Sequence, residues 1–293
     1  MRSLLFVPGD QPAKIEKALV SGADALILDL EDSVSPDRRA QARESVADVL
    51  MRPRTSGPAL IVRVNPLDGV DIDKDLAAIC AKNPSAIMLP KASGGGDVIH
   101  LATKLAAAEA IGDLPDGAIG IIAIATETAA SIFRLGTFVG ASHRLRGLTW
   151  GAEDLSADIG AETNRDETGA FAGPYRIARD LLLLGAAAAD VAAIDTVYTA
   201  YRDLEGLRIE AERARRDGFS AKMAIHPAQV DVINQVFTPT PEAIQHASKI
   251  VAAFQQNPGL GVIGIDGEML DRPHVRRAER VLARARAAGI AIR

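Results

Sequence analysis

Polar residues that could carry out chemistry recur at the carboxyl ends of short apolar runs. One run ends in Asp29, Glu31 and Asp32, and later runs end in Glu127 and Asp154. Carboxylates that share an apolar pocket repel one another, so we expect a cation among them. The other polar residues at such positions are Asp10, Arg63, Asn65, Lys91, Glu153, Asp195, Lys222 and His226.

The types of these side chains favour a hard metal ion as the cation. Carboxylates are numerous at the ends of the runs, histidine is scarce and cysteine is absent there. Oxygen ligands favour Mg²⁺, or Mn²⁺, over zinc. Mg²⁺ commonly takes one or two carboxylates and leaves its other positions to water or substrate oxygens. The sequence therefore predicts a Mg²⁺ site built from acidic side chains.

The elements that must position these residues alternate in type along the chain. Runs rich in Val, Ile and Leu are separated by helical patterns such as Pro36–Leu50 and Pro174–Ala188, which is typical of parallel strands covered by helices. Eight such units over about 250 residues favour an α/β fold of the TIM (β/α)8 barrel type. An open sheet remains the alternative, because periodicity does not reveal closure. The expected strands are Leu4–Pro8, Ala25–Leu30, Leu60–Asn65, Ala86–Lys91, Gly120–Thr126, Leu145–Gly151, Ala192–Tyr198 and Phe219–His226.

The end of the chain departs from this alternation. Thr240–Gln256 and the segment from Pro273 to about Ala288 have helical patterns, and Asp266-Gly267 predicts the turn of a short hairpin between them. We therefore expect a barrel over residues 1–238 and a C-terminal helical arm over residues 239–293. The arm would pack on the barrel or on a neighbouring subunit.

Charge and composition exclude several classes of protein. The chain has 293 residues and a net charge of −5 without a basic block, which argues against a nucleic-acid partner. A single cysteine, Cys80, excludes a disulfide framework. No apolar stretch is long enough for a signal peptide or a membrane span. These features predict a cytoplasmic protein with no membrane partner.

Many of the same residues lie in motifs that resemble those of the citrate lyase beta-subunit-like family. That family belongs to the wider group of malyl-CoA and citramalyl-CoA lyases and 2-oxo-acid aldolases. The resemblance covers nearly the whole chain, and the order of the motifs fits consecutive βα units. The motifs are RSLLFVPG (2–9), LDLEDSV (28–34), VRVN (62–65), MLPK (88–91), TET (126–128), GAEDLS (151–156), AIDTV (193–197), KMAIHP (222–227) and GEMLD (267–271).

The resemblance implies a Mg²⁺-dependent carbon–carbon lyase, an oxo-acid-lyase. Its substrate would be a malyl-, citramalyl- or citryl-CoA-like thioester of a 3-hydroxy dicarboxylic acid, and its products acetyl-CoA and a 2-oxo acid. Glu127 and Asp154 would bind the metal, and Arg63 would hold the substrate carboxylate. Asp271 would exchange a proton with the carbon next to the thioester, in the same subunit or a neighbouring one. The alternatives are a malyl-CoA thioesterase and a citrate lyase beta subunit that acts on an acyl carrier protein thioester.

The motifs imply further contacts and an oligomer. Arg2, Lys14 and Lys91 would meet phosphate or carboxylate groups of the CoA thioester at the barrel mouth. The family also implies a homotrimer or a hexamer. The remaining substrate-binding residues implied are Asp29, Glu31, Asp32, Ala152 and Glu153, with Glu31 acting through metal-bound water.

Several of these residues also have local structural interpretations. Asp271 precedes Pro273 at the start of a helical pattern and could cap that helix. We expect His226 to be a structural hydrogen-bonding residue, and Lys222 either pairs with Asp195 or contacts substrate. The other local interpretations are first-turn helix acids for Glu127 and Asp154 and an ion pair between Arg63 and Glu31.

Overall fold

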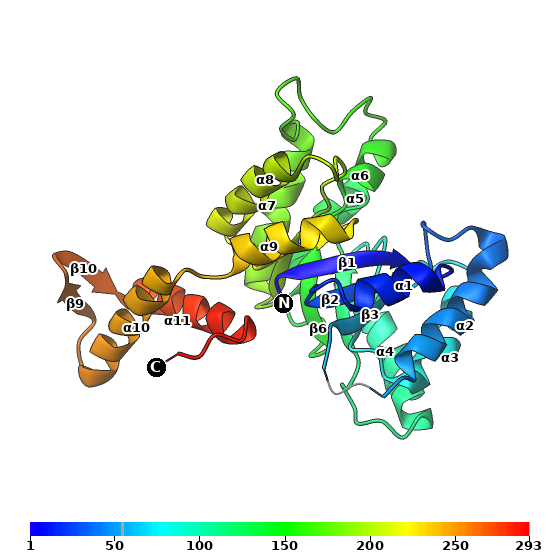
Figure 1. Ribbon diagram of the computed structural model, residues 1–293, viewed down its shortest axis with the longest axis horizontal. Coiled ribbons are helices and arrows are strands. Elements are labelled where there is room, and N and C mark those ends of the chain that lie inside the picture. Colours follow the sequence, from blue (N-terminus) through cyan, green and yellow to red (C-terminus); the bar gives the residue numbers. More distant parts are fainter. Residues whose placement is uncertain (54–55, 293) are drawn as a thin grey trace.

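Eight parallel strands close into a barrel in the computed structural model, which describes residues 1–53 and 56–292 (Figure 1). Each strand pairs with the next one in the sequence, and β8 pairs back with β1 through Lys222 and Ser3. The predicted TIM-type fold is therefore confirmed, and the open sheet is excluded. The strands are β1 (Ser3–Pro8), β2 (Ala25–Asp29), β3 (Ala59–Arg63), β4 (Ala86–Leu89), β5 (Gly120–Ile124), β6 (Leu145–Thr149), β7 (Ala192–Asp195) and β8 (Ala221–Ala224).

Helices on the outside connect the strands and return the chain to the amino end of the barrel. In the described residues, no helix has both the length and the apolarity needed to cross a membrane. The helices of the barrel are α1 (Pro12–Leu19), α2 (Arg39–Leu50), α3 (Ile72–Ile79), α4 (Gly95–Ile111), α5 (Ala129–Ile132), α6 (Ala152–Asp158), α7 (Gly173–Ala188), α8 (Leu204–Asp217) and α9 (Val230–Phe237). Short 3₁₀ turns cover Pro36–Arg38, Cys80–Lys82, Leu135–Phe138 and Pro227–Gln229.

The apolar core of the barrel has two layers, because alternate strand residues point to opposite faces. Side chains such as Leu4, Ile27 and Met88 fill the interior of the barrel. A larger cluster, which includes Leu26 and Val62, lies between the strands and the helices. Any strand residue can therefore be assigned to the interior or to the helix side from its position along the strand.

The tail extends away from the barrel (Figure 1). It comprises α10 (Pro241–Gln256), the hairpin β9 (Val262–Ile265) and β10 (Glu268–Asp271), and α11 (Arg272–Ala287). Asp266 and Gly267 have φ angles of 52° and 87°, which is the positive-φ turn that an Asp-Gly pair favours. These elements have an apolar cluster of their own that includes Phe254, Leu270 and Leu282.

Candidate active site

Two charged residues, Asp29 and Arg63, lie at the mouth of the barrel, which is the end where the carboxyl ends of the strands lie. Ile27 and Ile61 point into the interior, so the two-residue period of a strand places Asp29 and Arg63 on the same side. Arg63 donates from Nε and Nη2 to the two carboxylate oxygens of Asp29, each at 2.7 Å. Burial alone would raise the pKa of Asp29, but the Arg63 guanidinium outweighs it and holds that pKa below its ordinary value.

Lys91 lies among the acids that the sequence analysis selected. Its Nζ atom is 2.5 Å from Glu31 Oε1, 3.5 Å from Asp154 Oδ1 and 3.6 Å from Asp32 Oδ2. Burial would lower the pKa of Lys91, but the neighbouring acids, Glu31 first, raise it above its ordinary value. Lys91 thus carries an ammonium into a carboxylate cluster, which we define as Glu31, Asp32, Glu127 and Asp154.

Glu127 is the most strongly perturbed acid of the carboxylate cluster. It is buried, and its Oε2 atom accepts the backbone N–H of Lys91. Burial first, and then the nearby charges of Asp154 and Glu31, raise its pKa to about 8. Gly151 gives this side chain its space, because a Cβ atom there would lie 2.8 Å from Glu127 Cγ.

Glu127 and Asp154 are the side chains that could hold a divalent cation. No group of three or more His, Cys, Asp or Glu side chains forms a metal site within residues 1–53 and 56–292. Two carboxylates nevertheless fit Mg²⁺, which keeps several positions for water and substrate oxygens. The raised pKa of Glu127 is a second sign of fit, because a buried carboxylate favours a nearby positive charge.

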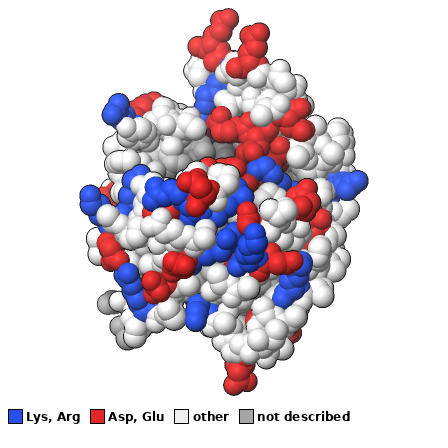
Figure 2. Space-filling model, turned by 90° about the vertical axis from the view of Figure 1, so that its right-hand side faces the viewer, with Lys and Arg blue, Asp and Glu red and all other residues white. Residues whose placement is uncertain are grey.

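The carboxylate cluster opens into a pocket of about 310 Å³. Figure 2 looks onto this face, where acidic and basic side chains gather around a hollow. The interior wall is apolar, and the Phe6 ring lies 4.9 Å from the Arg63 guanidinium carbon. The charged lining residues are Asp29, Arg63, Glu127, Glu153 and Asp154, and the large apolar ones are Phe6, Ile124, Trp150, Val197, Met223 and Ile225.

The apolar lining was not predicted as part of the site. Phe6, Ile124 and Met223 are interior positions near strand ends, so the alternation of each strand could have identified them. Ala152 and Glu153, which were predicted, line the pocket from the first turn of α6.

Arg2 does not lie at the mouth, so its predicted position is wrong. It precedes β1, and a residue before a parallel strand lies at the amino end of the barrel. There its guanidinium pairs with Asp24 at 2.7 Å and donates to Thr238 Oγ1 at 2.9 Å. Lys14, by contrast, is exposed in the first turn of α1, which follows the carboxyl end of β1.

Several local structural interpretations are confirmed. Asp271 caps α11, with a short contact of 2.5 Å between its Oδ1 atom and His274 Nδ1. His226 caps the 3₁₀ turn after β8, accepting the backbone N–H of Ala228. Lys222 pairs with Asp195 at 2.8 Å.

Asp271 lies far from the mouth of its own chain. It ends β10, and the hairpin is at the end of the molecule most distant from the barrel (Figure 1). On the hairpin, Asp271 is opposite Val262 and Met269 is opposite Gly264. The other face of the hairpin, with Ile263 and Leu270, packs on the helices. Asp271 therefore shares an outward face with Val262 and Met269, which are 47% and 78% exposed.

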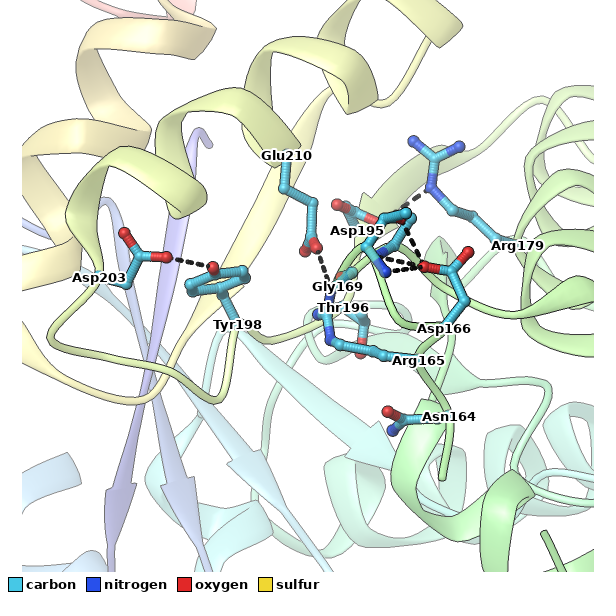
Figure 3. Close-up of polar contacts among 12 residues, drawn as sticks. Asn164, Arg165, Asp166, Gly169, Arg179, Asp195, Thr196, Tyr198, Asp203 and Glu210 are labelled. Atoms are coloured by element: carbon cyan, nitrogen blue, oxygen red, sulfur yellow. Dashed lines mark hydrogen bonds and ion pairs between the residues drawn. The ribbon is translucent and has the colours of Figure 1, made fainter. Parts of the chain in front are cut away.

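A larger cleft, of about 630 Å³, lies outside the barrel between α7 and α8. Two of its arginines are paired with acids: Arg165 with Glu210 at 2.9 Å (Figure 3), and Arg179 with Asp217 at 2.8 Å. Neither Glu127 nor any other member of the carboxylate cluster lines it. The smaller pocket at the mouth is therefore the candidate active site.

Comparisons with known proteins agree with this geometry. A family model described as HpcH/HpaI aldolase/citrate lyase matches residues 2–227. Citrate lyase subunit beta of Leuconostoc mesenteroides subsp. cremoris is 34% identical and is aligned over 98% of this chain and 93% of its own. A (3S)-malyl-CoA thioesterase of Cereibacter sphaeroides is 36% identical over 98% and 95% of the two chains.

Solved structures of CitE from Mycobacterium tuberculosis have the same fold. The complex with magnesium, acetoacetate and coenzyme A is 33% identical and covers 97% of each chain, with a TM-score of 0.77. A complex with magnesium and pyruvate is 30% identical and covers 96% of this chain and 97% of the other, with a TM-score of 0.72. A complex with oxaloacetate and magnesium is 33% identical and covers 81% and 97%, with a TM-score of 0.69.

Proposed function

Because this chain belongs to the HpcH/HpaI aldolase/citrate lyase family, we propose that it is a Mg²⁺-dependent carbon–carbon lyase. It would cleave a CoA thioester of a 3-hydroxy dicarboxylic acid into acetyl-CoA and a 2-oxo acid. The observation that carries the proposal is the carboxylate cluster, with Glu127 and Asp154 beside Arg63 at the mouth of the barrel. The magnesium in the M. tuberculosis structures supports the choice of metal.

Each residue has a defined part in this reaction. Glu127 and Asp154 would hold Mg²⁺, which when bound lowers the pKa of the substrate hydroxyl. Glu31, fixed by Lys91 and Arg63, would orient water around the metal. Arg63 would bind the carboxylate next to the hydroxyl.

Asp271 would supply the proton that the reaction needs. The bond between the hydroxyl-bearing carbon and the carbon next to the thioester breaks, and the second carbon takes up a proton. A carboxylic acid at that carbon is typically worth 10²–10⁴-fold in rate. Asp271 lies on an exposed apolar hairpin face far from its own mouth, which supports a role at the mouth of a neighbouring subunit. The arm would then join the subunits of a homotrimer or hexamer.

The site chemistry also bears on which thioester is cleaved. Arg63 has five N–H donors, and Asp29 occupies two of them, one on Nε and one on Nη2. Glu31 Oε2 is an ion-pair neighbour of Nη1 at 3.0 Å. The donors that remain on Nη1 and Nη2 would bind one substrate carboxylate. The rest of the pocket is walled by Phe6, Met223 and other apolar side chains. A second carboxylate would be buried there without a partner, so we propose malyl- or citramalyl-like substrates ahead of citryl-like ones.

The residues that we propose to bind CoA are chosen by their positions in the fold. Lys14 is exposed at the rim of the mouth, and no ion pair of its side chain occurs within the described part of the chain. It is therefore the residue that we propose for the CoA phosphates. Lys91 is held by the carboxylate cluster and would act there instead.

The test is a panel of malyl-, citramalyl- and citryl-CoA incubated with Mg²⁺, with acetyl-CoA and the 2-oxo acid both measured. We expect both products in equal amounts and no turnover with EDTA. Free malate without any glyoxylate would instead identify a thioesterase, as in the C. sphaeroides relative. Activity only on an acyl carrier protein thioester would identify a citrate lyase beta subunit. No metal-dependent reaction with any of these would overturn the proposal.

A further inference from the structure

A buried pair of opposite charges lies behind the apolar wall of the active-site pocket. Asp195 ends β7 and Lys222 is its register partner on β8. Their neighbours Ile194 and Met223 point into the barrel, so Asp195 and Lys222 point outward, between the strands and the helices. Both are at most 1% exposed. The pair therefore lies outside the pocket and cannot contact substrate.

Every hydrogen of the Lys222 ammonium has a partner. Its Nζ atom donates to Asp195 Oδ2 at 2.8 Å, Glu210 Oε1 at 2.9 Å and the carbonyl oxygen of Thr196 at 2.9 Å. Figure 3 shows Glu210 reaching from α8 and Arg179 from α7 toward Asp195. Arg179 Nε lies 3.6 Å from Asp195 Oδ1. The arrangement is a polar network around a fully buried ammonium and carboxylate.

The network holds two parts of the pocket wall. The free oxygen of Asp195, Oδ1, accepts the indole N–H of Trp150 at 2.9 Å. Trp150 directly precedes Gly151 and the helix turn that carries Asp154, and it lines the pocket. Thr196, whose carbonyl oxygen Lys222 binds, lines the pocket too. One buried charge pair thus fixes the indole that directly follows β6 and the residue that directly follows β7.

Trp150 is also held through an aromatic contact that leads back to the same network. Its ring meets Phe171 edge-on, with 4.9 Å between ring centroids. The guanidinium of Arg165 covers Phe171 at 4.0 Å, and Arg165 pairs with Glu210, which also binds Lys222. The indole is therefore held both by a hydrogen bond to Asp195 and by an edge-to-face contact with Phe171.

Stability is a weak explanation for such a pair. Replacing a buried ion pair by apolar residues of similar volume is often neutral or stabilising, because burying two charges is costly. We propose that Asp195 and Lys222 are positioning residues: they fix Trp150 and Thr196, and through Trp150 the turn that presents Asp154 to Mg²⁺ and the 2-oxo acid. The metal part of this inference rests on the proposed function.

The double variant Asp195→Leu/Lys222→Met tests the inference. The matched control is Glu109→Leu/Arg144→Met, which replaces an ion pair at 2.6 Å that is just as buried but lies before β6, at the amino end of the barrel. Binding of Mg²⁺ with and without pyruvate is measured by calorimetry, and folding by circular dichroism and thermal melting. Trp150 is the chain's single tryptophan, so its fluorescence reports on the pocket wall alone.

We expect the Asp195/Lys222 variant to remain folded and to bind Mg²⁺ roughly 10–100-fold more weakly. Acrylamide should quench its Trp150 fluorescence more effectively, because the ring is no longer held. The control should retain the wild-type Mg²⁺ affinity and quenching. If the Asp195/Lys222 variant binds Mg²⁺ and pyruvate as the wild type does, the pair is merely structural and the inference is wrong.

Two further measurements keep the result interpretable. If the double variant does not fold, the same measurements are made on Asp195→Asn, which keeps the shape of the side chain and one acceptor oxygen. Weaker Mg²⁺ binding with stronger quenching of Trp150 would support the inference, and wild-type values would overturn it. If the wild type binds Mg²⁺ and pyruvate but cleaves no thioester, the proposed function fails while this inference is still tested by binding. If the wild type binds no Mg²⁺, quenching of Trp150 decides: unchanged quenching in the variant overturns the inference.

Discussion

Glu127 makes the metal-free protein sensitive to pH. Its pKa is raised from 4.5 to about 8 in the fold, so the protonated form is favoured there. The stabilisation from this shift is complete below the ordinary pKa of 4.5 and is lost as the pH rises through about 8. As the proposed metal ligand, Glu127 would bind Mg²⁺ in its ionised form, and binding would compensate for this loss. We therefore expect the increase in melting temperature on adding Mg²⁺ to be larger at about pH 9 than at about pH 6.5.

The control for this prediction is Glu127→Gln, which cannot ionise. Its melting temperature should respond little to Mg²⁺ at either pH. A wild-type response to Mg²⁺ that is the same at both pH values would contradict the assignment of Glu127 as a ligand with a raised pKa.

Single residues were predictable where a strand end determined their position. Asp29, Arg63, Glu127 and Asp154 follow four different strands and meet at one mouth, because parallel strands all present their carboxyl ends there. The contacts of Lys91 were not predictable, since they depend on a left-handed backbone conformation, with φ at 52°, that turns the residue toward Glu31. The motif that contains Arg2 does not determine its end of the barrel; because Arg2 precedes β1, it lies at the amino end.

The turn between β6 and α6 is expected to tolerate no side chain at Gly151. A Cβ atom there would lie 2.8 Å from Glu127 Cγ and would force the carboxylate to move. We expect Gly151→Ala to weaken Mg²⁺ binding roughly tenfold or more while the barrel stays folded. Gly173→Ala is the matched control, because its Cβ would meet no atom within 4 Å. Calorimetry and circular dichroism measure both effects, and equal Mg²⁺ affinities of the two variants would disprove the steric argument.

At the level of elements, the apolar runs predicted all eight strands of the barrel. Seven of the eight strands end earlier than the runs, as in β7, which stops at Asp195 although the run continues to Tyr198. The reason is that residues beyond the ladder turn outward to build the mouth, where their backbone no longer pairs. The single turn of α5 (Ala129–Ile132) was not predictable from periodicity, because four residues are too few to show a helical repeat.

The charge of the whole site leads to a prediction about substrate choice. The mouth holds the carboxylates of Asp29 and the carboxylate cluster against two cations, Arg63 and Lys91. Even with Mg²⁺ bound, the net charge of the site would remain negative and would repel the additional carboxylate of a citryl thioester.

We expect kcat/KM for malyl- or citramalyl-CoA to exceed that for citryl-CoA by about tenfold or more. Steady-state kinetics with all three thioesters measure this ratio, and a preference for citryl-CoA would contradict the argument. The M. tuberculosis relative is in complex with oxaloacetate, so for this chain we expect a preference and not exclusion.

The sharing of a site between subunits is testable with two inactive variants. Glu127→Gln removes the proposed metal ligand from the mouth, and Asp271→Ala removes the proposed acid from the arm. If Asp271 acts on a neighbouring subunit, mixed oligomers contain an intact mouth next to an intact arm, and random assembly makes about a quarter of the sites complete. Co-expression should therefore restore roughly that fraction of wild-type activity. If Asp271 acts within its own chain, no chain has both groups and activity stays absent. Co-expression of Glu127→Gln with Asp154→Asn is the control, because both variants lose the mouth and cannot complement each other.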